Sequence, residues 1–113
     1  MKTLPNYENA VIPIEKLRDY CLNMTHPIGK HKALVFLSAL NFTSKDSTAL
    51  SQIIKESLAH FPAISNLKDQ HGERYYVDIK ISNFDKQVWV RTSWIIKTNA
   101  FIPIMTSCYV ISK

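Results

Sequence analysis

Two histidines and two lysines fall within seven residues of this sequence, in the segment His26-Pro27-Ile28-Gly29-Lys30-His31-Lys32. Pro27 disfavours helix at the preceding residue, and Gly29 tolerates unusual backbone angles. We therefore predict a loop at the beginning of this segment and a helix that begins near Lys30. Cations at a helix N-terminus oppose the helix dipole unless an anion lies nearby. Backbone N–H groups at a helix start bind phosphate, whose charge the lysines would neutralise. The segment predicts a phosphate site; the alternative is a solvated basic turn without a ligand.

A second group of candidates is Arg91-Thr92-Ser93-Trp94, inside an otherwise apolar stretch. An arginine in an apolar strand is costly unless it is paired or faces a cleft, and neighbouring hydroxyls add hydrogen-bond donors. Strict alternation places Arg91 and Ser93 on one face and Thr92 and Trp94 on the other, so both sets cannot line one cleft without a bulge. The alternative is a salt bridge from Arg91 to Asp78 on the neighbouring strand, with Trp94 in the core.

Near the end of the chain, Thr106 alternates with Ile104, Cys108 and Val110. A hydroxyl within an apolar face is either a satisfied core group or a contact to a substrate. The chain has two cysteines, Cys21 and Cys108, and no cysteine or histidine spacing of the zinc-binding kind. We expect both cysteines to be reduced core residues.

Length and composition predict one soluble domain spanning residues 1–113. The hydrophobic fraction of 46% is ordinary for a globular protein, no apolar run is long enough for a membrane span, and no export signal follows Met1. We therefore expect a cytoplasmic protein without a membrane partner. The net charge of +5 makes nucleic acid a candidate partner, although a basic surface can also serve solubility alone.

The periodicity of the apolar residues changes from helical to alternating along the chain, near Ala63. The helical half predicts three helices, at Pro13–Leu22, from Lys30 to about Asn41, and at Ser44–His60. The alternating half predicts four strands, at Ile64–Asp69, Arg74–Ile81, Gln87–Lys97 and Phe101–Ile111. The fold class is α+β, with about three N-terminal helices packed on a four-stranded antiparallel meander; Ala10–Ile12 could add an edge strand.

Four sequence features together suggest a family resemblance. They are Leu-Arg-Asp-Tyr-Cys-Leu-Asn, His26-Pro27-x-Gly29-Lys30-His31-Lys32-Ala33, Arg91-Thr92-x-Trp94 and Thr106-x-Cys108-Tyr109. Over nearly the whole chain, the pattern resembles a family of small uncharacterised bacterial proteins that is frequent in cyanobacteria. This resemblance implies no particular activity. More distantly, the order of helices and strands is similar to the Barnase–EndoU–colicin–RelE group of ribonucleases, many of which are toxins. Colicin D-like members pair a Lys/His helix start with a hydroxyl-x-Trp element, which Lys30-His31 and Thr92-x-Trp94 resemble.

This resemblance implies an endoribonuclease, a toxin of a toxin–antitoxin type system, that cleaves RNA by attack of the 2′-hydroxyl, with tRNA as one candidate target. The candidate catalytic residues are His31, His26, Arg91 and Thr92, and the candidate substrate-binding residues are Lys30, Lys32, Trp94 and Thr106. The histidines would move protons, because imidazole titrates near neutral pH, and the cations would stabilise the charged phosphorane. Thr92 would donate a hydrogen bond and Trp94 would stack on a base. We expect no metal or other cofactor.

The partners would be RNA and a cognate antitoxin or immunity protein. The competing hypothesis is a non-catalytic RNA- or protein-binding module, such as an antitoxin, an immunity protein or an adaptor. It predicts binding that survives changes at His31.

Overall fold

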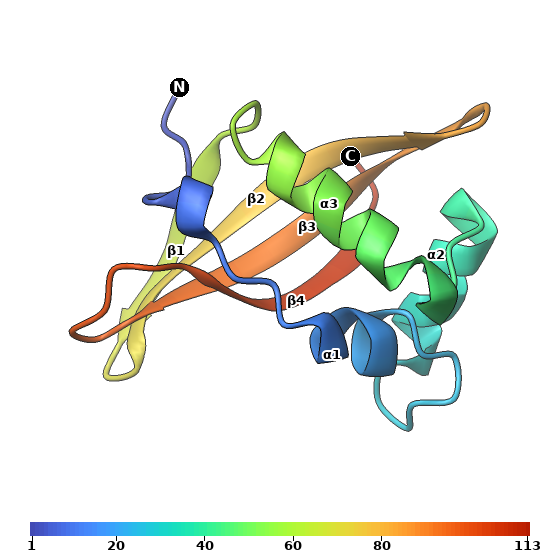
Figure 1. Ribbon diagram of the computed structural model, residues 1–113, viewed down its shortest axis with the longest axis horizontal. Coiled ribbons are helices and arrows are strands. Elements are labelled where there is room, and N and C mark those ends of the chain that lie inside the picture. Colours follow the sequence, from blue (N-terminus) through green and yellow to red (C-terminus); the bar gives the residue numbers. More distant parts are fainter.

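The computed structural model describes all residues from Met1 to Lys113, and it confirms the α+β class with helices before strands (Figure 1). The helices are α1 at Ile14–Lys16, extended by a π-helical turn at Leu17–Cys21, α2 at Lys30–Leu40 and α3 at Ser47–Ser57. Short 3-10 turns lie at Tyr7–Asn9 and Ser44–Asp46. The strands are β1 at Ala63–Asp69, β2 at Gly72–Asn83, β3 at Lys86–Lys97 and β4 at Ile104–Ile111. None of the helices has both the length and the apolar character needed to cross a membrane.

Local signals in the sequence explain where α2 and α3 begin and end. Asn41 closes α2 in the left-handed conformation, with φ 60°, and its backbone N–H donates to the last turn. Thr43 and Asp46 then form a capping box that leads through a 3-10 turn into α3. The predicted helices from Lys30 and from Ser44 are therefore confirmed, with Asp in place of the usual Glu in the capping box.

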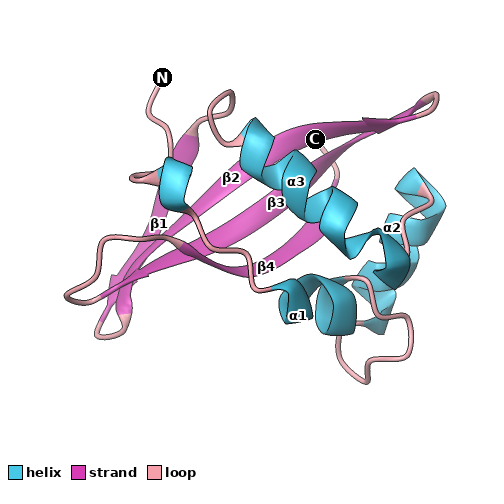
Figure 2. Cartoon of the chain, in the orientation of Figure 1, coloured by secondary structure: helices cyan, strands magenta, loops and turns pink.

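The four strands form one antiparallel sheet in the order β1-β2-β3-β4, as the sequence predicts. The layers are visible in Figure 2, where α3 runs across β2 and β3 on one side of the sheet. Alternation along β2 and β3 turns Val77, Ile79, Val90 and Trp94 toward the helices, where they are buried with Phe36 and other helical residues. The alternate residues of these strands, among them Tyr76, Asp78 and Arg91, lie on the opposite face of the sheet.

Helix α2 is fixed against β2 and β3 near its C-terminal end. The side chain of Asn83, on β2, donates to the carbonyl oxygen of Leu40 at 2.6 Å, and Lys86 Nζ donates to the carbonyl of Ser38 at 3.1 Å. Phe36, in the middle of α2, is fully buried in the core. These contacts fix the C-terminal half of α2 on the sheet.

The last strand departs from the prediction at its start, since β4 begins at Ile104 and not at Phe101. Pro103 has no N–H for a ladder, and Phe101 and Ile102 before it are exposed. On its outer edge, β4 meets Val11 in a single parallel bridge, in which Val11 N donates to Pro103 O and Met105 N donates to Val11 O, both at 2.9 Å. The edge strand expected at Ala10–Ile12 is reduced to this bridge.

A β-bulge between β3 and β4 corrects the predicted alternation of the last strand. Ser93 pairs with Ser107, but the next residue of β3, Trp94, pairs with Met105, so Thr106 is the extra residue. Met105 consequently faces the core and is fully buried with Cys108. The prediction that Thr106 shares an unbroken face with Ile104 and Cys108 is wrong.

Candidate functional site on the open face of the sheet

The face of the sheet that the helices leave open has Arg91 at its centre. The register places Arg91 directly opposite Asp78 on β2 and Tyr109 on β4. Tyr76 and Trp89 occupy neighbouring positions on the same face, and both remain partly exposed. The alternation predicted for β2 and β3 is confirmed here, because Arg91 and Trp89 share the face of Tyr76 and Asp78.

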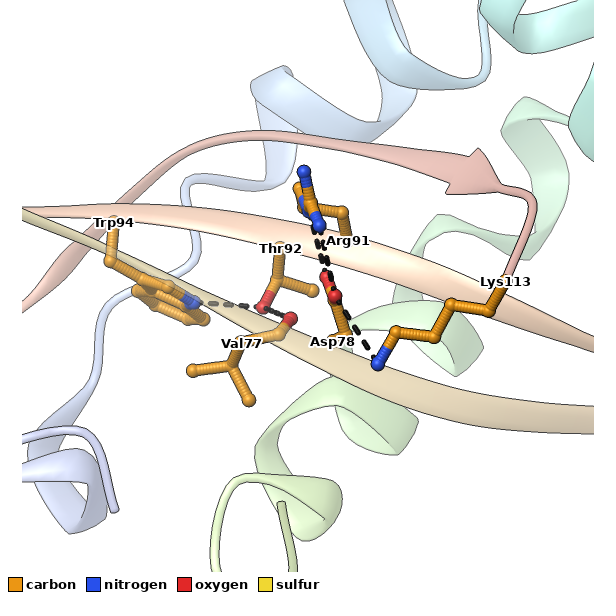
Figure 3. A network of polar contacts seen from close by, with 6 residues as sticks. All are labelled: Val77, Asp78, Arg91, Thr92, Trp94 and Lys113. Carbon is orange, nitrogen blue, oxygen red and sulfur yellow. Dashed lines mark hydrogen bonds and ion pairs between the residues drawn. The ribbon is translucent and has the colours of Figure 1, made fainter. Parts of the chain in front are cut away.

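Arg91 and Asp78 form a two-bond ion pair, in which Nε donates to Oδ1 at 2.9 Å and Nη2 donates to Oδ2 at 3.1 Å (Figure 3). The Asp78 side chain is 8% exposed, whereas that of Arg91 is 32% exposed. Lys113 Nζ lies 3.5 Å from Asp78 Oδ2. The pairing of Arg91 with Asp78, one of the two alternatives from the sequence, is thus confirmed.

Two of these charged groups also lie on aromatic rings. The guanidinium carbon of Arg91 is 4.1 Å from the ring centroid of Tyr76, and Lys113 Nζ is 4.3 Å from that of Trp89. Cations over aromatic faces are stabilised by the ring quadrupole and are restricted in their movement. Arg91 Nη1 has no hydrogen-bond partner in the protein, so the arginine keeps donors for a ligand.

The electrostatics of the pair keep both groups charged. Burial raises the pKa of the Asp78 carboxyl, but the hydrogen bonds and charge of Arg91, together with Lys113, outweigh it and hold the pKa below its usual value. The hydrogen bonds to Asp78 raise the pKa of Arg91 above its ordinary value. The open face therefore carries a permanently charged, oriented guanidinium.

Beside the pair, a cavity of about 420 Å³ opens on this face. Its walls include three aromatic side chains, Phe61, Tyr76 and Trp89, and the charged groups of Asp78, Arg91 and Lys113. Phe61, from the connection between α3 and β1, meets the Trp89 ring edge-on with 5.9 Å between centroids. The volume lies within the range of small-ligand pockets.

In the basic segment, His26 has a structural role. Its Nδ1 accepts hydrogen bonds from the backbone N–H groups of Ile28 and Gly29, each at 3.0 Å, and its ring meets Tyr20 edge-on at 4.8 Å. Nδ1 is therefore unprotonated and the ring proton lies on Nε2, since a neutral imidazole carries one proton. A Cβ at Gly29 would come within 2.8 Å of the Tyr20 carbonyl oxygen, which shows how closely this turn packs on the first helix.

The other residues of the segment reach the solvent. Lys30 and His31 are exposed, and the His31 ring has no hydrogen-bond partner. Lys32 Nζ lies 4.3 Å from the ring centroid of Tyr109, the cross-strand neighbour of Arg91. The structure thus brings Lys32 of the helix start onto the ring of Tyr109, which is the cross-strand neighbour of Arg91 on β3.

Thr92 and Trp94 lie on the other face of the sheet, in the core. Their exposed fractions are 0% and 1%. The Thr92 hydroxyl donates to the Val77 carbonyl at 2.7 Å and accepts from Trp94 Nε1 at 2.9 Å, as Figure 3 shows. The sequence suggests that Thr92 donates to RNA and that Trp94 stacks on a base. In this structure neither side chain reaches the surface, so neither can contact RNA. Thr106 is the unpaired, half-buried residue of the bulge, and its side chain makes no hydrogen bond to Arg91.

Alternation along two strands could have located part of the aromatic group. Tyr76 and Trp89 follow from the predicted faces of β2 and β3, whereas Phe61 lies in a connection whose position depends on tertiary packing. The position of Tyr109 beside Arg91 depends on the register of β4 past the bulge. No group of three or more His, Cys, Asp or Glu side chains is placed to hold a metal ion.

Fold and site together define a small α+β protein in which helices cover one face of an antiparallel meander and leave a basic, aromatic face open. The chain belongs to the DUF6883 family, described as a domain of unknown function, whose profile matches residues 3–112. This membership agrees with the resemblance to an uncharacterised family, whereas the comparisons give no support to the more distant ribonuclease resemblance. Neither the curated proteins nor the solved structures contain a match.

Proposed function

We propose that the open face of the sheet binds RNA and that the protein is a metal-independent endoribonuclease. The observation that carries this proposal is the placement of Lys32 and Arg91 around Tyr109, which joins the basic helix start to the aromatic strand surface. A toxin of a toxin–antitoxin type system is the biological role that fits such an activity. A cognate antitoxin or immunity protein would then act by covering this face.

The surface chemistry supports RNA as the ligand. Single-stranded RNA is bound by exposed aromatic rings that stack on bases and by cations that contact phosphates. Here Tyr76, Trp89 and Tyr109 are partly exposed on one face, and Lys32, Arg91 and Lys113 lie among them. The net charge of +5 adds a general attraction for polyanions.

The proposed reaction is transfer of the phosphate to the 2′-oxygen. The 2′-oxygen attacks phosphorus, the bond to the 5′-oxygen breaks, and the products carry a 2′,3′-cyclic phosphate and a 5′-hydroxyl. His31 takes the 2′-proton and gives a proton to the leaving 5′-oxygen, while Lys30, Lys32 and Arg91 stabilise the charge on the phosphorane. His26 cannot accept a proton at Nδ1 without losing its two backbone hydrogen bonds, so His31 is the histidine free for this step.

The test is incubation of the purified protein with total tRNA in the presence and absence of EDTA. Wild type should release fragments with 2′,3′-cyclic ends in both conditions, and His31→Ala should slow release by about 100-fold or more. The matched control is His71→Ala, an exposed histidine in the turn between β1 and β2, which should cleave like wild type. Expression of wild type, but not of His31→Ala, should arrest bacterial growth.

The second candidate is an RNA-binding module without catalysis. It is favoured by one observation, the firm pairing of Arg91 with Asp78, which suits a rigid binding platform. Wild-type protein that binds RNA without cutting it, with His31→Ala binding equally well, would establish this candidate over the nuclease. Absence of both binding and cleavage would reject the RNA proposal as a whole.

A further inference from the structure

The cavity beside Arg91 combines features that the proposed function does not explain by itself. General binding of an RNA strand requires exposed rings and cations along a surface. Here an open, concave space of about 420 Å³ is lined by three aromatic rings and by the charged groups of Asp78, Arg91 and Lys113. This combination fits recognition of one unit of a ligand, because concave sites bury most of the surface of what they bind.

The polar wall of the cavity has an excess of positive charge. Arg91 and Lys113 together contribute two cations, and Asp78 contributes one anion, which both cations contact. Asp78 directs Nε and Nη2 of Arg91 toward itself and thereby leaves Nη1 for a ligand. The Lys113 side chain is 44% exposed, and its Nζ lies 3.5 Å from Asp78 Oδ2, so its charge is next to the cavity and open to a ligand. The wall is suited to a phosphate.

The apolar wall is suited to a planar ring. Trp89, Phe61 and Tyr76 come from three separate parts of the chain and converge on the same space. Trp89 is partly exposed, and its indole N–H has no partner in the protein, in contrast to Trp94, whose indole N–H is bonded to Thr92. Because Trp89 is partly exposed, its unpaired indole N–H is available to solvent or to a ligand.

We infer that this cavity binds a single nucleotide unit, with its base against Trp89 and Phe61 and its phosphate on Arg91 and Lys113. The inference rests on the proposed function in that it supplies the base-binding subsite for the RNA. Asp78 acts as a positioning residue, because it orients Arg91 and does not need to touch the ligand.

The direct test is calorimetric titration of the protein with AMP, GMP, CMP and UMP, with the matching nucleosides and inorganic phosphate as separate titrants. At least one nucleotide should bind, and its nucleoside and phosphate alone should each bind about tenfold or more weakly, since base stacking and phosphate contacts both contribute. Bound nucleotide should also quench the tryptophan fluorescence. The quenched residue should be Trp89, because the only other tryptophan, Trp94, is 1% exposed and out of reach of a ligand.

Two pairs of variants connect the binding to this cavity. Trp89→Ala should weaken nucleotide binding about tenfold, while Phe84→Ala, at the exposed tip of the β2–β3 hairpin, should not change it. Lys113→Ala should weaken it as well, and Lys55→Ala, on α3 and so on the helical side of the sheet, should not. Trp94 remains in Trp89→Ala as a fluorescent indicator of an intact core.

The outcomes separate this inference from the proposed function. Nucleotide binding that is lost in Trp89→Ala supports the cavity even if no RNA is bound or cleaved, which would reject the RNA proposal alone. Trp89→Ala that weakens RNA binding, without measurable binding of free nucleotides, also supports the cavity. The inference is overturned if Trp89→Ala changes neither nucleotide nor RNA binding, whatever RNA the wild type binds.

Discussion

The ion pair between Arg91 and Asp78 determines the chemistry of the open face at the scale of single residues. A carboxylate that is 8% exposed would be costly without a partner, and the two hydrogen bonds from Arg91 supply one. The pair also fixes the guanidinium on the Tyr76 ring. Orientation and stability thus depend on the same two side chains.

Replacing Asp78 with Asn should destabilise the fold by about 2 kcal/mol, because Arg91 loses its counter-charge. The loss is limited to this size because the Arg91 side chain stays partly hydrated. The pKa of Asp78 is lowered in the folded state, so its contribution is present above the unfolded carboxyl pKa of about 4 and is lost as pH falls through the lower folded value. Urea denaturation of both proteins between pH 7 and pH 2 measures this. A difference between wild type and Asp78→Asn that stays constant across that range would contradict the assigned ion pair.

At the scale of secondary-structure elements, the Thr92 hydroxyl connects β2, β3 and the indole of Trp94 within the core. Both hydrogen bonds are inaccessible to solvent, so neither can be replaced by water if the hydroxyl is removed. This network belongs to the stability of the sheet, although the same two residues form the hydroxyl-x-Trp element that suggested a site in the sequence.

Thr92→Val keeps the shape of the side chain and removes both hydrogen bonds. It should lower the free energy of unfolding by about 1–3 kcal/mol, because the Trp94 N–H is left unsatisfied in the core. RNA binding and cleavage should remain at wild-type level under conditions where the variant is folded. Urea denaturation and the tRNA assay measure the two effects. A stable Thr92→Val protein without activity would instead restore the catalytic role expected from the sequence.

The sequence predicts the site where its signals are local and periodic. Alternation over two long strands, β2 and β3, is enough to place Arg91 and Asp78 on one face and Trp94 on the other. The faces of Ile104 and Met105 could not be predicted, because the bulge beside Ser93 shifts the alternation by one residue and the residue types alone do not mark it. His26 could not be assigned either, since its two acceptor bonds depend on the turn conformation and not on residue type.

On the scale of the whole molecule, the positive charge should be concentrated where RNA binds. The chain has a net charge of +5, and Lys30, Lys32, Lys80, Arg91 and Lys113 lie at the helix start or around the aromatic side chains of the open face. Because Arg91 is already paired with Asp78, we count four to five of these cations as available to phosphates. Each phosphate contact with single-stranded RNA releases counterions, so the affinity must fall as salt rises.

The logarithm of the association constant for single-stranded RNA should fall with the logarithm of salt concentration with a slope of about −3 to −3.5. Lys32→Ala should reduce the magnitude of that slope by about 0.7, because one phosphate contact is lost. Lys55→Ala removes the same charge from α3, on the other side of the sheet, and should leave the slope unchanged. Fluorescence anisotropy with a labelled oligonucleotide at several salt concentrations measures both variants. Equal slopes for Lys32→Ala and Lys55→Ala would mean that RNA is attracted by net charge alone, and the open face would lose its assignment as the binding surface.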